Sequence, residues 1–359
     1  MKWKEILLIF ISLVFSLLMI SIFLEIYYYT FHFKDGWLTV NTQFDPELGW
    51  ATIPNETTTV NNKSYTTNSF GFRSPEVDMA KKHILIIGDS VAWGFGVSDD
   101  ETLSYYLGKK LKSFQVLNLG VSGYGITQYY LNLKRNIDKV NPEMVIIVIT
   151  TGNDLGDDMS DSRSGKSKPL FIYKENYTTG DTKLIRTNDK ISRYSCVNLF
   201  SKSFLLSQAF FSTLKSSFCK PRNLIEEHAK LVITSFFEKF SDLSRKYGFE
   251  LLFVISPEKN STKIRSKDEL SKILRTNSPP PVEVYGRLSY DYFLKILDQL
   301  NYNYVDFFNE LVIKRIDIDK LYLENDGTHY SKLGNKNLAE TIFRNINTSV
   351  PESLSVMKQ

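Results

Sequence analysis

The chain has 359 residues, of which 42% are hydrophobic, 23% are charged and 14% are aromatic, and its formal net charge is +4. This composition is typical of a folded protein and not of a disordered one. The small net charge, without a dense basic stripe interleaved with aromatic residues, argues against a nucleic-acid partner.

The first element is an uncharged apolar stretch over residues 6–24. As a helix it would span about 28 Å at about 1.5 Å per residue, close to the hydrocarbon thickness of a bilayer. A cleaved signal peptide is the alternative, but its apolar core is usually shorter, and no small-residue cleavage site follows here. We therefore expect a signal-anchor transmembrane helix over 1–33. Lys2 and Lys4 precede it, so the positive-inside rule predicts a single-pass protein of the cytoplasmic membrane whose main domain is extracytoplasmic.

Residues 34–80 are rich in Asn, Thr, Gly and Pro. Such a composition predicts turns, and the runs TTTV and KSYTTN predict short β segments. We expect a linker between the membrane and the folded domain.

From residue 81 to residue 348, short apolar runs alternate with amphipathic ones. Runs of strand length are HILII (83–87), QVLNL (115–119), EMVIIVIT (143–150), FELLFVIS (249–256) and YNYVDFF (302–308). Helical periodicity covers 126–140, 225–247, 289–300 and 330–346. Buried strands separated by helices predict an α/β fold, a five-stranded parallel sheet covered on both faces.

Two stretches interrupt this alternation of strands and helices. Residues 155–222 are predicted to be an insertion after the third strand, and residues 257–285 a long loop after the fourth. Both follow the carboxyl ends of strands, where open α/β sheets place their sites.

The insertion contains both cysteines, Cys196 and Cys219, which lack the C-x-x-C spacing of a metal or redox site. The sequence is compatible with two free thiols and with a disulfide between these cysteines. The acidic residues of this region, Asp154, Asp157, Asp158 and Asp161, lack the spacing of a calcium loop, so we expect a solvated loop and no metal.

The first candidate for chemistry is Ser90, in Gly88-Asp89-Ser90 directly after an apolar strand. A serine there exposes its hydroxyl close to backbone N–H groups that can hold an oxyanion. The alternative is a helix cap, because Asp and Ser are both favoured at that position.

A nucleophilic serine needs a base, and the chain has four histidines: His32, His83, His228 and His329. The first lies beside the membrane helix, the second opens a strand at the opposite end, and the third sits in a helical segment. His329 follows the fifth strand and therefore lies at the same sheet edge as Ser90. Asp326, three residues earlier, can hold one imidazole nitrogen and leave the other to accept a proton.

Gly123 and Asn153 follow the second and third strands. A backbone N–H at Gly123 and the side-chain amide of Asn153 would join the N–H of Ser90 as oxyanion donors. Taken singly, Gly and Asn at these positions also fit ordinary turn chemistry.

The order Gly88-Asp89-Ser90, Gly123, Asn153 and Asp326-x-x-His329 resembles the four motif blocks of the SGNH (GDSL-like) hydrolase superfamily, over about residues 82–346. The resemblance implies a flavodoxin-like three-layer α/β/α sandwich. It also implies a Ser90–His329–Asp326 triad with an oxyanion hole from Ser90, Gly123 and Asn153. The first block reads GDSV where the family has GDSL. The LGW…PN…FGFRS stretch is similar to that of membrane-anchored bacterial members.

We therefore expect a serine esterase without metal or organic cofactor. Its substrate would be a small molecule, glycan or lipid carrying an acyl ester at the cell envelope. An O-acyltransferase with the same triad and a non-catalytic binding protein of the same fold are the alternatives. The oligomeric state is left open.

Overall fold

The computed structural model describes residues 3–32, 40–158, 162–163, 166–175, 182–187, 222–276, 282–314 and 317–349. The expectations about Cys196, Cys219 and Asp161 lie outside these residues.

The centre of the fold is a five-stranded parallel sheet, as predicted. Its strands are β5 (Lys82–Ile87), β6 (Phe114–Asn118), β7 (Met144–Thr150), β12 (Glu250–Ser256) and β13 (Tyr304–Asp306). They lie in the order β13-β12-β7-β5-β6, and every pairing is parallel. Numbered along the chain, this is the order 2-1-3-4-5 of a flavodoxin-like sheet. The point where the order reverses lies between β5 and β7.

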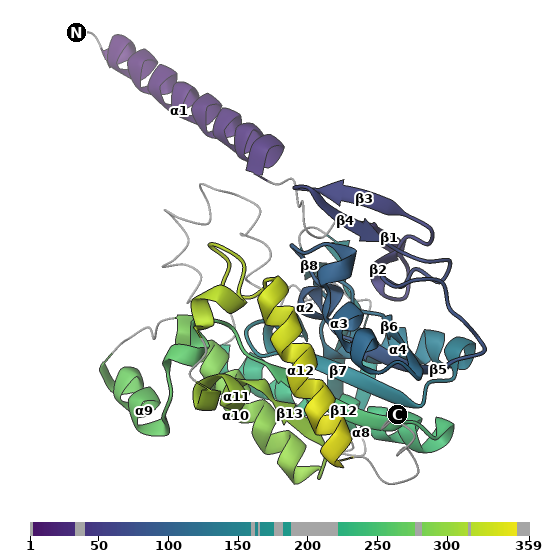
Figure 1. The fold of residues 1–359 in the computed structure, drawn as a ribbon. Coiled ribbons are helices and arrows are strands. Elements are labelled where there is room, and N and C mark those ends of the chain that lie inside the picture. The colour runs from purple at the N-terminus through teal and green to yellow at the C-terminus, as the bar shows by residue number, and fades with distance from the viewer. Residues whose placement is uncertain are drawn as a thin grey trace.

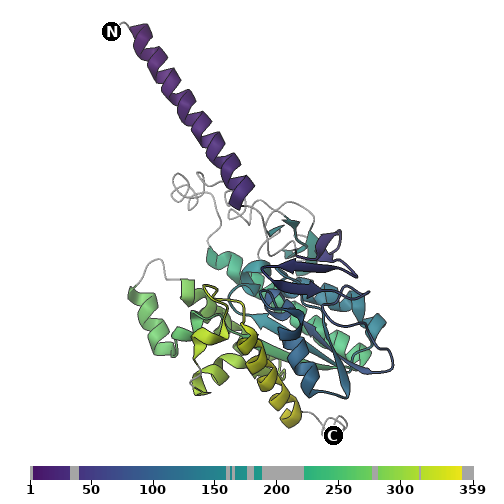
Figure 2. The ribbon, with the colours of Figure 1, turned by 45° about the horizontal axis from the view of Figure 1, so that its top comes forward.

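Helices cover both faces of this sheet and make three layers (Figures 1 and 2). One face is covered by α4 (Ile126–Val140), α8 (Arg222–Tyr247) and α10 (Val282–Gln299). The other is covered by α3 (Leu103–Lys110), α11 (Phe307–Lys314) and α12 (Lys332–Ser349). Successive side chains of a strand point to opposite faces, so Leu85 packs with the first group and Ile84 with the second.

The structure differs from the expected elements after β12. The predicted loop over 257–285 contains the helix α9 (Lys267–Thr276), and α10 begins inside it. Leu270, Ile273 and Leu274 of α9 do have helical spacing, and only Leu270 of this helix is buried. The predicted strand over 302–308 is too long, since Phe307 already begins α11. A short apolar run fits a strand or a buried helix equally well.

The insertion and the connecting loops hold smaller elements. These are α5 (Asp154–Asp158), β8 (Ser162–Arg163), β9 (Lys166–Ser167), β10 (Leu170–Glu175), β11 (Thr182–Thr187), and the 3-10 turns η1 (Asp99–Glu101), η3 (Ser261–Lys263) and η4 (Ile318–Leu321). The strands pair as antiparallel hairpins, β8 with β9 and β10 with β11.

The segment before the sheet packs against the domain. It forms two antiparallel hairpins, β1 (Thr42–Asp45) with β2 (Gly49–Thr52), and β3 (Thr57–Val60) with β4 (Lys63–Thr66). Leu48, Trp50 and Phe72 from this segment are buried in the same core as α4 and β7. Residues 48–72 therefore contribute to the core of the sandwich.

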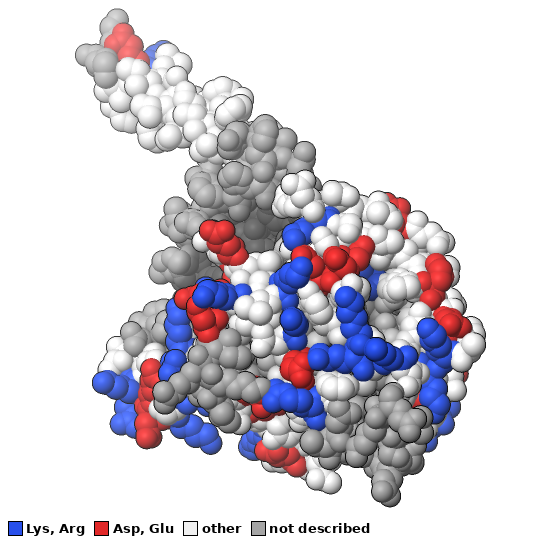
Figure 3. All heavy atoms as spheres, viewed as in Figure 1, with Lys and Arg blue, Asp and Glu red and all other residues white. Residues whose placement is uncertain are grey.

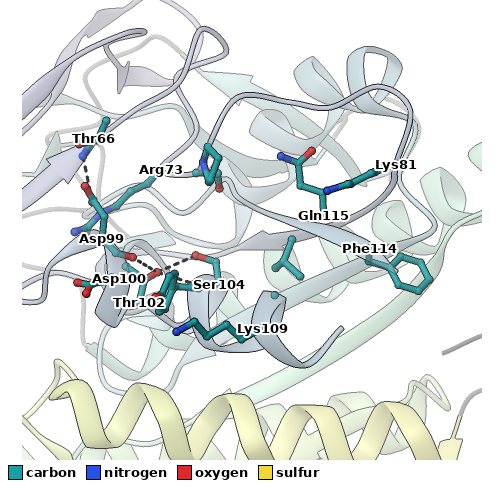
Figure 4. A pocket seen from close by; sticks show the side chains of 15 residues that line it. Thr66, Arg73, Lys81, Asp99, Asp100, Thr102, Ser104, Lys109, Phe114 and Gln115 are labelled. Carbon is teal, nitrogen blue, oxygen red and sulfur yellow. Dashed lines mark hydrogen bonds and ion pairs between the residues drawn. The ribbon is translucent and has the colours of Figure 1, made fainter. Parts of the chain in front are cut away.

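Arg73 fastens this segment to the loop that follows α2 (Ser90–Trp93). Its buried guanidinium donates to the carbonyls of Trp93 (3.0 Å), Gly94 (2.7 Å) and Val97 (2.7 Å) and pairs with Asp99 (2.9 Å). A cavity of about 650 Å³ opens beside it between α3 and β6 (Figure 4). None of the predicted catalytic residues lines this cavity.

The helix α1 (Trp3–His32) contains the predicted apolar stretch. Its part Trp3–Leu24 has a mean hydropathy of 3.0 and is exposed, which makes it long and apolar enough to cross a membrane. Figure 3 shows the uncharged surface of this helix beyond the charges near its N-terminal end. A signal sequence has the same properties.

Candidate active site

Ser90 is the first residue of α2, directly after β5. Asp89 is the N-cap, and its side chain accepts a hydrogen bond from the backbone N–H of Val91 at 2.9 Å. The turn needs glycine at position 88, because a Cβ there would lie 2.6 Å from Cβ of Ala92. The capping function therefore belongs to Asp89, and the hydroxyl of Ser90 is available for another partner.

That partner is His329, in the loop before α12. The imidazole Nε2 of His329 lies 2.7 Å from Oγ of Ser90, and its Nδ1 lies 2.7 Å from Oδ2 of Asp326. An ionised carboxylate can only accept, so Nδ1 carries the proton and Nε2 is left to accept the serine proton. The structure thus brings the three predicted residues together in one hydrogen-bonded chain.

Several contacts keep the Asp326 carboxylate ionised and in place. Burial raises the pKa of Asp326, but the hydrogen bond and charge of His329 and the backbone N–H groups of His329 and Thr328 outweigh it, and the pKa falls to about 2. These N–H groups donate to Oδ1 at 2.9 Å and 2.8 Å. At neutral pH the carboxylate is therefore a fixed acceptor that orients the imidazole.

The ring of His329 also has an aromatic neighbour, Phe95, with ring centroids 4.7 Å apart. His83 is far from this site in the fold: its ring contacts the carbonyls of Val140 (2.7 Å) and Asp78 (3.0 Å) at the start of β5. The structure describes the backbone of His32 and His228 but not their side chains.

Gly123 lies in the loop between β6 and α4, with a φ of 80° that favours glycine. This loop is tied to the Gly88–Ser90 turn, because the N–H of Val121 donates to the carbonyl of Gly88 at 3.0 Å. Within the described part of the chain, neither the N–H of Ser90 nor that of Gly123 has a backbone or side-chain acceptor. Both donors are therefore available to a ligand.

Asn153 follows β7 and lies beside the Gly88–Ser90 turn. Its amide Nδ2 donates to Oδ2 of Asp89 at 3.0 Å and to Oδ2 of Asp157 at 2.8 Å. Its Oδ1 is buried without a hydrogen-bond partner in the structure. Both amide hydrogens are thus held by carboxylates, and Asn153 must release one of them to bind an oxyanion.

The sequence indicates no role for Asp89 beyond that of a motif residue and a possible helix cap. The side chain of Asp89 is fully buried and accepts hydrogen bonds from Val91, Asn153 and the hydroxyl of Thr150 (2.9 Å). Burial raises its pKa, while these donors and the charge of His329 lower it. Asp89 links the strand end of β5 to that of β7, which the Gly-Asp-Ser order alone does not reveal.

The expectation of a solvated acidic loop is wrong for Asp154, Asp157 and Asp158, which are buried. Burial raises the pKa of Asp154 and of Asp158. Each carboxylate has partners outside α5. Asp154 accepts from Tyr129 (2.7 Å), Asp158 from Thr127 (2.6 Å), and Asp157 pairs with Arg163 and lies 3.8 Å from Nζ of Lys168. Only the fold brings these partners together, so the spacing of the aspartates alone is misleading.

Comparisons with known proteins give a likeness to solved structures only. No protein-family model matches the chain, and no curated protein matches it in sequence. Similar structures include an acetyl xylan esterase, 13% identical with a TM-score of 0.42 over 73% of this chain and 98% of that one. A member of the lipolytic G-D-S-L family from Veillonella parvula is 10% identical, with a TM-score of 0.42 over 75% and 100%. A lipase/acylhydrolase from Enterococcus faecalis is 13% identical, with a TM-score of 0.40 over 74% and 96%. These values describe a partial likeness in fold, so the function is argued from the side chains of this chain.

Proposed function

We propose that this protein is a serine esterase of the SGNH type that hydrolyses acyl esters through an acyl-enzyme. The observation that carries the proposal is the continuous hydrogen-bonded chain from Ser90 through His329 to Asp326, with 2.7 Å at both links. It lies at the topological switch point of the sheet, where open α/β folds bind their ligands.

In the first half of the reaction, Oγ of Ser90 attacks the ester carbonyl carbon while its proton passes to Nε2 of His329. The N–H groups of Ser90 and Gly123 stabilise the oxyanion that forms, joined by the amide of Asn153. His329 then gives the proton to the leaving alcohol oxygen as the C–O bond breaks, and an acyl-serine remains. Asp326 stabilises the imidazolium throughout.

In the second half, a water molecule loses a proton to His329 and attacks the acyl-serine. The same N–H groups hold the second oxyanion. When this intermediate collapses, the carboxylic acid leaves and Ser90 recovers its proton from His329. No step in this scheme needs a metal or organic cofactor.

The substrate class follows from the position of the protein. The apolar helix Trp3–Leu24 anchors the chain in the cytoplasmic membrane, with the catalytic domain on the extracytoplasmic side. The substrates within reach are then O-acyl groups of envelope glycans and ester bonds of lipids.

The proposal is tested by labelling the full chain in detergent micelles with a fluorophosphonate, which reacts with activated serines. We expect stoichiometric labelling of the wild type and none of Ser90→Ala. Ser256→Ala is the matched control, because Ser256 also ends a strand of the sheet but pairs with the hydroxyl of Tyr330 at 2.9 Å and not with a histidine. It should label like the wild type.

Two results would overturn the assignment: a folded wild type that stays unlabelled, or labelling that survives in Ser90→Ala. Incubation with p-nitrophenyl acetate then separates hydrolysis from transfer. An esterase releases acetate in a one-to-one ratio with p-nitrophenol, even when an excess of a sugar alcohol is present. A transferase instead forms the acetylated sugar.

A further inference from the structure

The orientation of the Gly123 N–H depends on one peptide unit. This N–H belongs to the peptide that joins Ser122 to Gly123, so its direction is fixed by the plane of that peptide. In a trans peptide the C=O and N–H bonds point in opposite directions. A group that holds the carbonyl of Ser122 therefore also aims the N–H of Gly123.

The carbonyl of Ser122 is held by Trp50. The indole Nε1 donates to this oxygen at 3.0 Å, and the whole Trp50 side chain is buried with 0% exposure. A donor on the carbonyl also polarises the peptide and strengthens its N–H as a donor. Trp50 thus contacts the oxyanion peptide from the side opposite to the site.

Trp50 is itself fixed in position. The hydroxyl of Tyr124 donates to its backbone carbonyl, and the two rings lie 5.7 Å apart. The hairpin that carries Trp50 is docked on α4 by Arg135, which donates to Asp45 at 2.7 Å and to Glu47 at 2.6 Å. The indole N–H therefore has a defined direction.

The carbonyl on the other side of the Gly123 α-carbon is held as well. The buried Nζ of Lys168 donates to the oxygen of Gly123 at 3.3 Å and to that of Asp157 at 3.0 Å. The loop around Gly123 is thus held between a residue from the segment before the sheet and one from the insertion. Both lie outside the four motif blocks.

We propose that Trp50 is a positioning residue for the oxyanion hole, and that its indole N–H aims the N–H of Gly123 at the developing oxyanion. This inference rests on the proposed esterase function. By this inference the hairpin β1–β2 contributes to catalysis, because it supplies the indole N–H that orients the peptide between Ser122 and Gly123.

The test compares Trp50→Phe with the wild type as full chains in detergent micelles. Phenylalanine keeps an aromatic ring in the core but has no N–H donor. With p-nitrophenyl acetate we expect kcat to fall about 10-fold or more while KM changes less than about twofold, because an oxyanion donor acts on the transition state. The inhibition constant of phenylboronic acid, which forms a tetrahedral adduct with serine, should rise by a similar factor.

Tyr302→Phe is the control for the loss of an aromatic donor to a backbone carbonyl. The Tyr302 hydroxyl donates to the carbonyl of Phe237 at 2.8 Å and contacts neither carbonyl beside Gly123, so this variant should lower the melting temperature and leave kcat unchanged. Should Trp50→Phe fail to fold, 3-benzothienylalanine at position 50 replaces only the N–H by sulfur and keeps the size of the ring system.

The outcomes separate the inference from the function on which it rests. An active wild type with an equally active Trp50→Phe, or a variant that raises only KM, overturns the inference alone. A folded wild type that neither turns over p-nitrophenyl acetate nor reacts with the fluorophosphonate overturns the proposed function and the inference with it.

Discussion

The imidazole of His329 lies 2.7 Å from the hydroxyl of Ser90, although 239 positions separate the two residues in the chain. Ser90 begins the helix after β5, while His329 lies in the loop that leads into α12. Parallel strands end at one edge of the sheet, which is why residues so far apart in sequence meet. Four predictions follow from the surroundings of this pair.

Asp326→Asn should lower kcat by about 10²–10⁴-fold, because an asparagine neither fixes the productive imidazole tautomer nor stabilises the imidazolium. Steady-state hydrolysis of p-nitrophenyl acetate measures the effect. Circular dichroism of the variant should match the wild type, since the residue is partly exposed. A variant with wild-type kcat would show that the Asp326–His329 contact has no part in catalysis.

Asp326 should also make the stability of the protein depend on pH. Its pKa in the folded protein, about 2, lies below its ordinary value of 3.8, so its ionised form favours the folded state. This stabilisation is fully present above the ordinary pKa and is lost as the pH falls toward 2. Urea unfolding of the wild type and Asp326→Asn at several pH values should give a difference in unfolding free energy that is largest at neutral pH. A difference that stays constant down to pH 2 would contradict the assignment.

Asn153→Ala should affect both activity and stability. It removes a candidate oxyanion donor, which should lower kcat by about 10²-fold or more. It also takes one donor from each of the buried carboxylates Asp89 and Asp157, which should cost about 1–3 kcal/mol of unfolding free energy. Enzyme kinetics and denaturant titration of the same sample measure the two effects. Loss of stability with unchanged kcat would leave Asn153 as a structural link between the two carboxylates only.

Gly120→Ala should destabilise the protein by about 1–3 kcal/mol or more, because a Cβ there would lie 2.5 Å from the backbone nitrogen of Trp93. The clash is with the backbone of α2, which cannot give way as a flexible side chain can. Gly156→Ala is the matched control, since a Cβ at that position has nothing within 4 Å. Its unfolding free energy should stay within about 1 kcal/mol of the wild type. Equal losses of unfolding free energy in the two variants would contradict the close approach of Gly120 to the backbone of α2.

Much of the architecture could be predicted from local patterns. The strands β5, β7 and β12 are continuous apolar runs because both of their faces are buried, and α4 repeats its apolar residues with a helical period. The strand before Phe307 has three residues, too few for one period to be distinguished from another. The helix α9 does have helical spacing at Leu270, Ile273 and Leu274, which the expectation of a loop over 257–285 did not take into account.

The candidate site could be predicted as far as it depends on strand ends. Ser90, Gly123, Asn153 and His329 each follow a strand of a parallel sheet, and the sequence order of the strands is enough to bring them to one edge. What holds these residues could not be predicted. The partners of the buried Asp157, namely the buried Lys168 and the partly exposed Arg163, come from the insertion, whose sequence has no clear period.

The sequence by itself determined the alternation of strands and helices and the apolar N-terminal helix. It also determined that a serine, an aspartate and a histidine follow strands whose carboxyl ends lie at one edge of the sheet. These features depend on side-chain type and local spacing, because the period of the apolar side chains selects the backbone geometry that buries them. Only the tertiary structure decided that Asp89 and not Ser90 caps α2, that the aspartates of α5 are buried, and that Trp50 holds the carbonyl beside Gly123. The Trp50–Ser122 hydrogen bond and the burial of the aspartates join segments far apart in the chain, and no local pattern encodes them. The Asp89–Val91 hydrogen bond is local, but the sequence allows either residue as the cap, and only the geometry distinguishes them.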